Sequence, residues 1–332
     1  MSNDELYVAI DVDVVDTWVA LVNPFGQIKG DLKKPSHSFK EDRGIKSAIA
    51  IMQELLKSKS VKPENIRGIG ISTPMLEVKM KDRSTVLPFL YMAHFKHEFP
   101  NTLVRAAADV TLMALAEFNI TYQSAPKSLY YLNWGSGIGG GIVLNGRIWP
   151  GAHGVASNIG HLPIKGVGMK CWCGHTDCLT TYAAGEILPI HYFKMLESMK
   201  PKNYKSPFEG KSQKDVTFID IMKASAAGDV IATKVFDMAT TAMAKALSIV
   251  VNLFNPELIL IGGAVAGASS DLVNMVSQKT KTDLMFPETH KTAIVPSKIH
   301  RAGLLGAYQF VFANAKAQQG KKVGKALKAV KK

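Results

Sequence analysis

The three cysteines of the chain lie within eight residues, at Cys171, Cys173 and Cys178, and His161 stands ten residues before the first. One imidazole and three thiolates form a complete tetrahedral ligand set for zinc. Because protein ligands would fill all four positions, the zinc would be structural rather than catalytic. Its role would be to hold a loop that cannot build a core of its own. The sequence therefore predicts a zinc centre in residues 161–178.

Two other interpretations of the cysteines are open. They could be three buried free thiols beside an unrelated histidine. A disulfide is disfavoured, because joining the two cysteines of a Cys-x-Cys pair strains the ring, and an odd count leaves one thiol over. Clustered thiols in a chain that shows no secretory signal fit a reducing compartment, so we expect the protein in the cytoplasm.

Strands and helices alternate along the chain and must position these residues. Two strand-turn-strand openings, near residues 7 and 130, are each followed by a mixed α/β segment, which suggests two similar halves. We expect a surface loop at 198–214 and a flexible lysine-rich tail at 316–332. The apolar patterns predict strands at 6–12, 17–23, 66–72, 129–134 and 258–261, further strands that begin at about 27 and 141, and helices at 42–58, 102–118, 231–254 and 303–315.

Composition and charge set wider bounds. With 47% hydrophobic residues among 332, the chain can build a large core or two domains. No apolar run reaches the length of a membrane span, and the first residues lack a basic segment followed by an apolar one. The net charge is +13, and seven lysines lie in residues 316–332. This balance suits contact with nucleic acid or another polyanion, and the alternative is a tail that only aids solubility.

The cysteine stretch carries a resemblance to a known family. Gly160-His161-Leu162, followed by Cys-x-Cys-Gly-x-x-x-Cys-Leu from Cys171, resembles the zinc signature of the ROK family (repressors, open reading frames and sugar kinases). The resemblance runs from about Tyr7 to about Phe312. It implies a two-lobed, actin-like (ribonuclease-H-like) α/β sugar-kinase fold with an inserted zinc loop and a nucleotide in the cleft between the lobes. The implied parts are a first lobe at 1–118 with helix 303–315 packing back on it, a larger lobe at 119–302 with the zinc loop at 161–178, and the basic tail at 316–332.

The resemblance implies which residues would handle ATP-Mg. In active relatives the first phosphate loop reads Asp-x-Gly-Gly-Thr, and here Asp11 is kept while Asp13 and Val14 replace the glycines. β-Branched valine disfavours a glycine-type turn, and added carboxylates repel a polyphosphate unless a metal intervenes. A second phosphate loop at 135–141 is intact; a packing turn is the alternative, but the position of the loop between two strands favours the phosphate loop. An adenosine motif at 255–264 is plausible, and a strand-to-helix turn fits it equally well. The implied nucleotide-binding residues are Asp11, Gly135, Ser136, Gly137, Gly139, Gly140, Gly262 and Gly263.

The resemblance also implies a catalytic base and a sugar site. Asp109 matches the general base that takes the proton from the attacking sugar hydroxyl, and an ordinary helix N-cap is the competing interpretation. His161, which in relatives both binds zinc and reaches the sugar, is kept. Asn158 and Thr180 stand where relatives have sugar-binding glutamates, and Ala108 replaces an asparagine. Asn and Thr can still bind hydroxyls, but without charge-assisted strength.

The positions that hold the fold are thus kept, while those that touch ligand are mostly replaced. We therefore predict a ROK homologue with impaired or lost sugar phosphorylation, a pseudokinase-like binding or scaffold protein. The alternative is an active, glucokinase-like hexose or N-acetylhexosamine kinase with an altered substrate. Repressor members carry an N-terminal helix-turn-helix domain, and none is expected here because the kinase-like core begins at Tyr7. We expect no membrane span. The resemblance implies a homo-oligomer. The basic charge and the loop at 198–214 could equally serve a larger protein assembly, and the tail could contact polyanions non-specifically.

Overall fold

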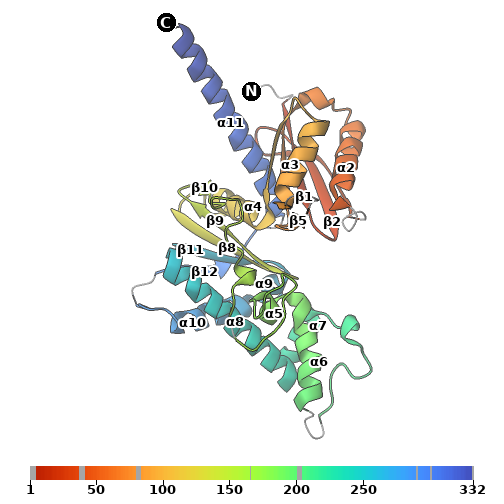
Figure 1. Cartoon of the computed structure of the whole chain (residues 1–332), viewed down its shortest axis with the longest axis vertical. Coiled ribbons are helices and arrows are strands. Elements are labelled where there is room, and N and C mark those ends of the chain that lie inside the picture. The colour runs from red at the N-terminus through yellow and green to blue at the C-terminus, as the bar shows by residue number, and fades with distance from the viewer. Residues whose placement is uncertain are drawn as a thin grey trace. The chain divides into compact units, whose positions relative to one another are not determined.

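The structure, a computed structural model, describes residues 5–36, 42–79, 84–164, 166–199, 204–288, 291–299 and 301–330. The chain divides into two compact units (Figure 1). Unit 1 comprises Met1–Gln123 and Ile299–Lys332, and unit 2 comprises Ser124–Lys298. The sequence placed these divisions after residues 118 and 302.

The main sheet of unit 1 has five strands in the order β3-β2-β1-β4-β7. β1 pairs antiparallel with β2, and β2 with β3, whereas β1, β4 and β7 run parallel. The carboxyl ends of these three parallel strands therefore meet at one edge of the sheet. The elements of unit 1 are β1 (Leu6–Val12), β2 (Asp16–Val22), β3 (Ile28–Pro35), α2 (Ile45–Ser58), β4 (Ile66–Thr73), β5 (Glu77–Lys79), β6 (Ser84–Val86), α3 (Leu87–Glu98), β7 (Leu103–Ala108), α4 (Asp109–Ala116) and α11 (Ala302–Val330).

The sequence of β4 explains how both faces of this sheet are covered. Isoleucine and glycine alternate along the strand, and alternate residues of a strand point to opposite faces. Ile69 and Ile71 are fully buried in a core with side chains of α2 and α3. On the other face α11 lies so close that a Cβ on Gly70 would stand 2.0 Å from the carbonyl oxygen of Ala307 (Figure 1). Glycine is therefore required where α11 crosses β4.

Two predicted helices of unit 1 have different bounds in the structure. The helix predicted at 102–118 is wrong over its first part, because Leu103–Ala108 form β7 and only then does α4 begin. The run Leu-Val-Arg-Ala-Ala-Ala favours a helix by composition, but pairing beside β4 overrides that weak preference. The helix predicted at 303–315 continues to Val330, so the lysine-rich segment extends α11 rather than following it.

Unit 2 repeats the topology of unit 1. Its sheet has the order β10-β9-β8-β11-β12, with β8, β9 and β10 antiparallel and β8, β11 and β12 parallel. Of the predicted loop 198–214, residues 200–203 lie outside the described residues. The elements of unit 2 are β8 (Ser128–Trp134), β9 (Ile138–Leu144), β10 (Arg147–Ile148), α5 (Thr180–Ala183), α6 (Leu188–Met199), α7 (Phe218–Ala226), α8 (Val230–Phe254), β11 (Leu258–Gly262), α9 (Ala264–Gly267), α10 (Ser270–Thr282) and β12 (Ala293–Pro296).

The long helix α8 forms the centre of the core of unit 2. By length and composition it is the one helix in the described part of the chain that could cross a membrane, so the expectation that no apolar run is long enough was too strict. However, 67% of the 18-residue apolar stretch of this helix is buried inside the protein. Its buried side chains belong to the same apolar core as side chains of β8, β11 and α10, as those of a core helix do.

Candidate functional site

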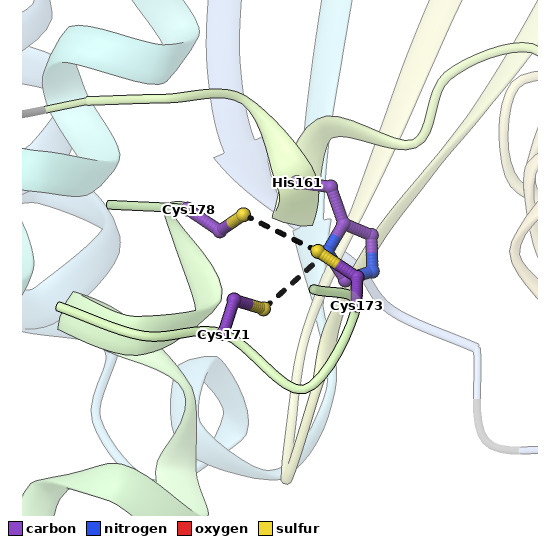
Figure 2. Close-up of side chains that lie close together, drawn as sticks. All are labelled: His161, Cys171, Cys173 and Cys178. Carbon is purple, nitrogen blue, oxygen red and sulfur yellow. Dashed lines mark hydrogen bonds between the residues drawn. The ribbon is translucent and has the colours of Figure 1, made fainter. Parts of the chain in front are cut away.

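The four predicted metal ligands meet in unit 2 (Figure 2). Cys171 Sγ lies 3.7 Å from His161 Nδ1, and Cys173 Sγ lies 3.6 Å from Cys178 Sγ. All four ligand atoms lie within 4.8 Å of one another, and none of the three cysteines forms a disulfide. For metal–sulfur bonds of about 2.3 Å, tetrahedral geometry places neighbouring sulfurs about 3.8 Å apart. The four side chains therefore fit a tetrahedral metal ion.

Short backbone pairings bring these ligands together. Two isolated antiparallel bridges, Pro163 with Cys178 and Lys170 with Thr176, fold the segment back on itself. Between them the Cys171 N–H donates to the carbonyl oxygen four residues later at 2.8 Å, which closes the turn that carries the central thiol. The loop has few apolar side chains to bury, so these hydrogen bonds and the ligand set together fix its shape.

A second group of functional side chains lies at the edge where the parallel strands of unit 1 end. Asp11 lies opposite Ser72 in the pairing of β1 with β4, and Asp109 follows the last residue of β7. The Ser72 hydroxyl donates to Asp11 Oδ1 at 2.6 Å, and the Val110 N–H donates to Asp109 Oδ1 at 2.7 Å. The strand register thus places the family's expected phosphate-loop aspartate and expected base on one edge.

Burial raises the pKa of both carboxyl groups. Burial raises the pKa of Asp11 to about 6, against the lowering effect of the Ser72 hydroxyl. It raises the pKa of Asp109 to about 7, and the negative charges of Asp11 and Asp13 act in the same direction. Such a carboxyl group exchanges its proton near neutral pH, which is the property that general acid–base catalysis needs.

The competing interpretation of Asp109 as an N-cap does not hold in the structure. The N-cap residue of α4 is Ala108, and Asp109 is the first residue of the helix. Its carboxylate accepts from the next N–H along the chain instead of from the second or third free N–H that a capping side chain satisfies. The position of this carboxylate is therefore set by the strand-to-helix junction.

The turn between β1 and β2 stands where the family resemblance expects the first phosphate loop. The Asp13 N–H donates to the Asp16 carbonyl oxygen at 2.8 Å, and the Val14 N–H donates to Asp13 Oδ1 at 2.5 Å. The side chains of Val14 and Val15 are exposed. The N–H groups of the two residues that replace the loop glycines, Asp13 and Val14, are therefore already used inside the turn.

The second glycine-rich turn divides into a packed part and an open part. A Cβ on Gly140 would lie 2.3 Å from the Tyr130 hydroxyl, so close packing explains that glycine. A Cβ on Gly137 would meet nothing within 4 Å, and both Gly137 and Ser136 are exposed. Packing does not account for Gly137, which leaves the tip of the turn as the part that suits ligand contact. Gly135 and Gly139 lie on either side of that tip.

The glycines of the expected adenosine motif have packing reasons of their own. A Cβ on Gly262 would lie 2.0 Å from the Tyr131 hydroxyl. Gly263 has a φ of 95° and caps α9, with the Trp134 carbonyl oxygen 2.5 Å from where a Cβ would stand. The strand-to-helix turn is thus sufficient to explain both residues, and a nucleotide is not needed to account for them.

The two replaced sugar-binding positions are occupied locally. The Thr180 hydroxyl is buried and donates to the Gly160 carbonyl oxygen at 2.8 Å. The Asn158 side chain is exposed and donates to the Val155 carbonyl oxygen at 3.1 Å. Neither side chain reproduces a carboxylate that could grip two hydroxyls.

Sequence reasoning missed three polar side chains that support these sites. They are Ser72, which donates to Asp11, Asp177, whose buried carboxylate accepts from two backbone amides of the metal loop, and Tyr182, which donates to Asp177 at 2.7 Å. Ser72 is the last residue of a predicted strand and Asp177 immediately precedes a predicted metal ligand. Both places could have been inspected, although neither residue type is diagnostic there.

Comparisons with known proteins identify the family to which the chain belongs. The sequence model of the ROK family matches residues 7–314. The chain is 28% identical over 205 residues to the N-acetylglucosamine repressor of Escherichia coli O157:H7, which covers 61% of this chain and 48% of the repressor. It therefore spans about half the length of that relative. It is 26% identical over 292 residues to the glucokinase of Halalkalibacterium halodurans, covering 83% of this chain and 85% of the enzyme.

Solved structures give the same result for the fold. A ROK family glucokinase from Streptomyces griseus, in complex with glucose and AMPPNP, has a TM-score of 0.73 at 20% identity and covers 92% of this chain and 99% of its own. The ROK hexokinase from Thermus thermophilus has a TM-score of 0.73 at 22% identity, with coverage of 94% and 99%. The expected two-lobed, actin-like sugar-kinase fold is thereby confirmed.

Proposed function

Because the chain belongs to the ROK family, we propose that it is a sugar-kinase homologue with impaired or lost ATP-dependent sugar phosphorylation. In this proposal the protein keeps the sugar-kinase fold, with its metal-binding loop, and acts as a pseudokinase-like binding or scaffold protein. The observation that carries the proposal is the turn between β1 and β2, in which Asp13 and Val14 use their N–H groups within the turn.

The electrostatics of that turn act in the same direction. A phosphate loop works because several backbone N–H groups converge on a negatively charged group. Here one such N–H is already bound to the carboxylate of Asp13, and Asp11 adds further negative charge nearby, whereas Asp16 is paired with Lys33 at 2.9 Å. A polyphosphate would have to displace the Asp13 contact and overcome this charge. Both costs weaken nucleotide binding.

The sugar side of the site supports the proposal as well. The Ala108 side chain has no polar group, the Thr180 hydroxyl already donates to the Gly160 carbonyl oxygen, and the Asn158 side chain is neutral. Each lost hydrogen bond to a sugar hydroxyl costs about 1 kcal/mol. Three such losses weaken binding by roughly a hundredfold. His161 remains beside this segment, but its Nδ1 faces Cys171.

We further propose that the ion bound by His161, Cys171, Cys173 and Cys178 is zinc. Three thiolates and one imidazole are the soft donor set that zinc prefers over calcium or magnesium. When bound, the ion supplies structural stabilisation, since all four of its positions are filled by protein. Thiol ligands of this kind remain reduced in the cytoplasm, which is where we place the protein.

A second candidate function is an active kinase for an altered hexose or N-acetylhexosamine. The observation in its favour is Asp109, which stands at the position of the family's base and has a pKa raised to about 7 by burial. At neutral pH such a group can accept the proton of a hydroxyl that attacks a phosphoryl group. The open tip of the second turn, at Ser136 and Gly137, is where phosphate oxygens would lie in this case.

Partners are part of the proposal only in outline. By family resemblance we propose a homo-oligomer. The lysine-rich residues 316–332 are proposed to contact polyanions without sequence specificity. Binding of this kind falls steeply with salt, because it depends on counterion release. Removing 316–332 should abolish it, and unchanged binding of a nucleic-acid duplex by the shortened chain would contradict it.

A coupled turnover assay tests the kinase proposal. Zinc-loaded protein would be supplied with ATP-Mg and, in turn, with a panel of hexoses and N-acetylhexosamines. We expect phosphorylation far below the rates of ordinary sugar kinases, and the Asp109→Asn variant serves as the control for contaminating kinases. Turnover of any sugar at ordinary sugar-kinase rates that Asp109→Asn abolishes would overturn the proposal and establish the second candidate.

A further inference from the structure

The residue before Cys178 is an aspartate with an unusual backbone. Asp177 has a φ of 58°, in the left-handed region that residues with a side chain rarely adopt. Only 6% of the residue is exposed. Burying a carboxylate costs free energy unless hydrogen bonds satisfy it. The contacts of Asp177 must therefore account for both its backbone and its burial.

Both oxygens of the Asp177 carboxylate accept hydrogen bonds from the opposite arm of the loop. The Gly168 N–H donates to Oδ2 at 2.9 Å, and the Met169 N–H donates to Oδ1 at 3.0 Å. The Tyr182 hydroxyl donates to the same Oδ1 at 2.7 Å. Hydrogen bonds to a carboxylate are stronger than neutral ones, so this one side chain fixes the segment that leads into Cys171.

The backbone of Asp177 makes the same connection. Its N–H donates to the Met169 carbonyl oxygen at 2.7 Å, and its carbonyl oxygen accepts from the Ile164 N–H at 2.8 Å. Tyr182 is 2% exposed and belongs to the apolar core of unit 2. Asp177 thus ties together the arm before Cys171, the arm that ends in Cys178, and the core beneath them.

We propose that Asp177 is a positioning residue for the metal centre. Its carboxylate holds the two arms of the loop at the separation that brings the thiols of Cys171 and Cys178 within reach of one ion. Less of the binding free energy is then spent on ordering the loop. This role rests on the proposed metal site, and it is independent of whether the protein phosphorylates sugars.

The test compares zinc binding by the full chain and its variants. Asp177→Asn keeps the shape of the side chain but loses the charge, and Asp177→Gly removes the side chain while it favours the left-handed backbone. Dissociation constants come from competition with a chromophoric chelator, and release rates from excess chelator. We expect both variants to bind zinc about 10- to 100-fold more weakly, as loss of a supporting residue around a metal typically does.

A matched control separates this role from ordinary loss of stability. Asp220→Asn removes a carboxylate that accepts from the N–H and hydroxyl of Thr217, at 2.8 Å and 2.7 Å, at the start of α7. It should leave zinc affinity unchanged. Tyr182→Phe removes one donor and should weaken zinc binding less than Asp177→Asn. In the double variant the loss of zinc-binding free energy should be smaller than the sum of the two single losses, because both substitutions act through one oxygen.

Hydrogen exchange and cobalt spectra complete the test. In zinc-free protein the amides of Gly168 and Met169 should exchange faster in Asp177→Asn than in the wild type. The cobalt-loaded variant should keep a tetrahedral sulfur-rich spectrum, since no ligand is changed. Zinc affinities and release rates within twofold of the wild type in both Asp177 variants would overturn the role. Failure of the wild type to bind zinc would overturn the metal site and this role together.

Discussion

Two turns of this molecule use an aspartate in the same way and with opposite consequences. In the turn between β1 and β2, the Asp13 carboxylate accepts from the Val14 N–H. In the metal loop, the Asp177 carboxylate accepts from the N–H groups of Gly168 and Met169. The first contact occupies an amide that would face a phosphate. The second fixes a segment that carries metal ligands.

The consequences are opposite because the N–H groups that donate to the two aspartates would otherwise have different roles. An N–H at an exposed turn is available to a ligand, so a neighbouring carboxylate competes with that ligand. An N–H in a loop with few apolar side chains helps to order that loop when it donates to a buried acceptor. The same chemical contact therefore closes one site and builds another, and only the surroundings distinguish the two cases.

The largest expected effect concerns the metal loop. Cys178→Ser should abolish stoichiometric zinc binding and with it the stabilisation that zinc gives, about 4 kcal/mol when free zinc is a thousandfold above the dissociation constant. Metal analysis and thermal unfolding with and without zinc measure this. His175→Ala is the matched control, because its Nδ1 lies 3.5 Å from Cys173 Sγ but outside the ligand set. Equal zinc loss in the control would show that His175 is itself a ligand.

The second largest expected effect concerns nucleotide affinity at the turn between β1 and β2. Replacing Asp13 and Val14 together by glycine frees an N–H and removes a negative charge. Affinity for ATP-Mg should rise about tenfold or more, since a hydrogen bond to a charged group contributes about 1.5–3 kcal/mol. Val14→Ala keeps the Asp13 contact and should show no gain. Calorimetry measures both, and equal affinities in the wild type and the double variant would break the comparison.

A smaller effect concerns Asp109. Its pKa is raised by burial to about 7 from 3.8, so the folded protein holds this proton at pH values where the unfolded chain has lost it. Its contribution to stability is complete below about pH 4 and is lost as the pH rises towards 7. Asp109→Asn should therefore be more stable than the wild type at pH 8, by on the order of 2 kcal/mol, with little difference at pH 4.

Chemical denaturation at several pH values measures this difference. Asp283→Asn, at an exposed position of unit 2, controls for the loss of one negative charge. A difference between Asp109→Asn and the wild type that stays constant from pH 4 to pH 8 would contradict the raised pKa.

Much of the fold could be predicted because its signals are local or carried by several motifs. Apolar runs identified β1, β4 and β8, and the cysteine spacing identified the metal loop. β7 was missed because Leu103–Ala108 is a strand only through its pairing with β4, which no local pattern reveals. The predicted C-terminal helix ends too early because the lysine-rich segment 316–332 was interpreted as a flexible tail, although lysine is a good helix former.

In the candidate sites, too, features set by residue type and spacing could be predicted, whereas features set by the folded conformation could not. Ligand identities follow from residue type and spacing, so the four metal ligands could be named beforehand. The hydrogen bonds of Asp177 could not, because they join residues whose separation in space depends on the folded loop. The use of the Val14 N–H by Asp13 likewise became visible only once the turn had a definite conformation.

The most direct test of the central claim is a calorimetric titration of ATP-Mg into the zinc-loaded wild-type protein. Stoichiometric zinc and a cooperative thermal transition would first establish that the fold is intact. We expect no saturable heat up to millimolar nucleotide, because the Asp13 and Val14 N–H groups of the β1–β2 turn are already bonded within it. Saturable binding of one ATP-Mg per chain at lower concentration would contradict the account and favour an active kinase.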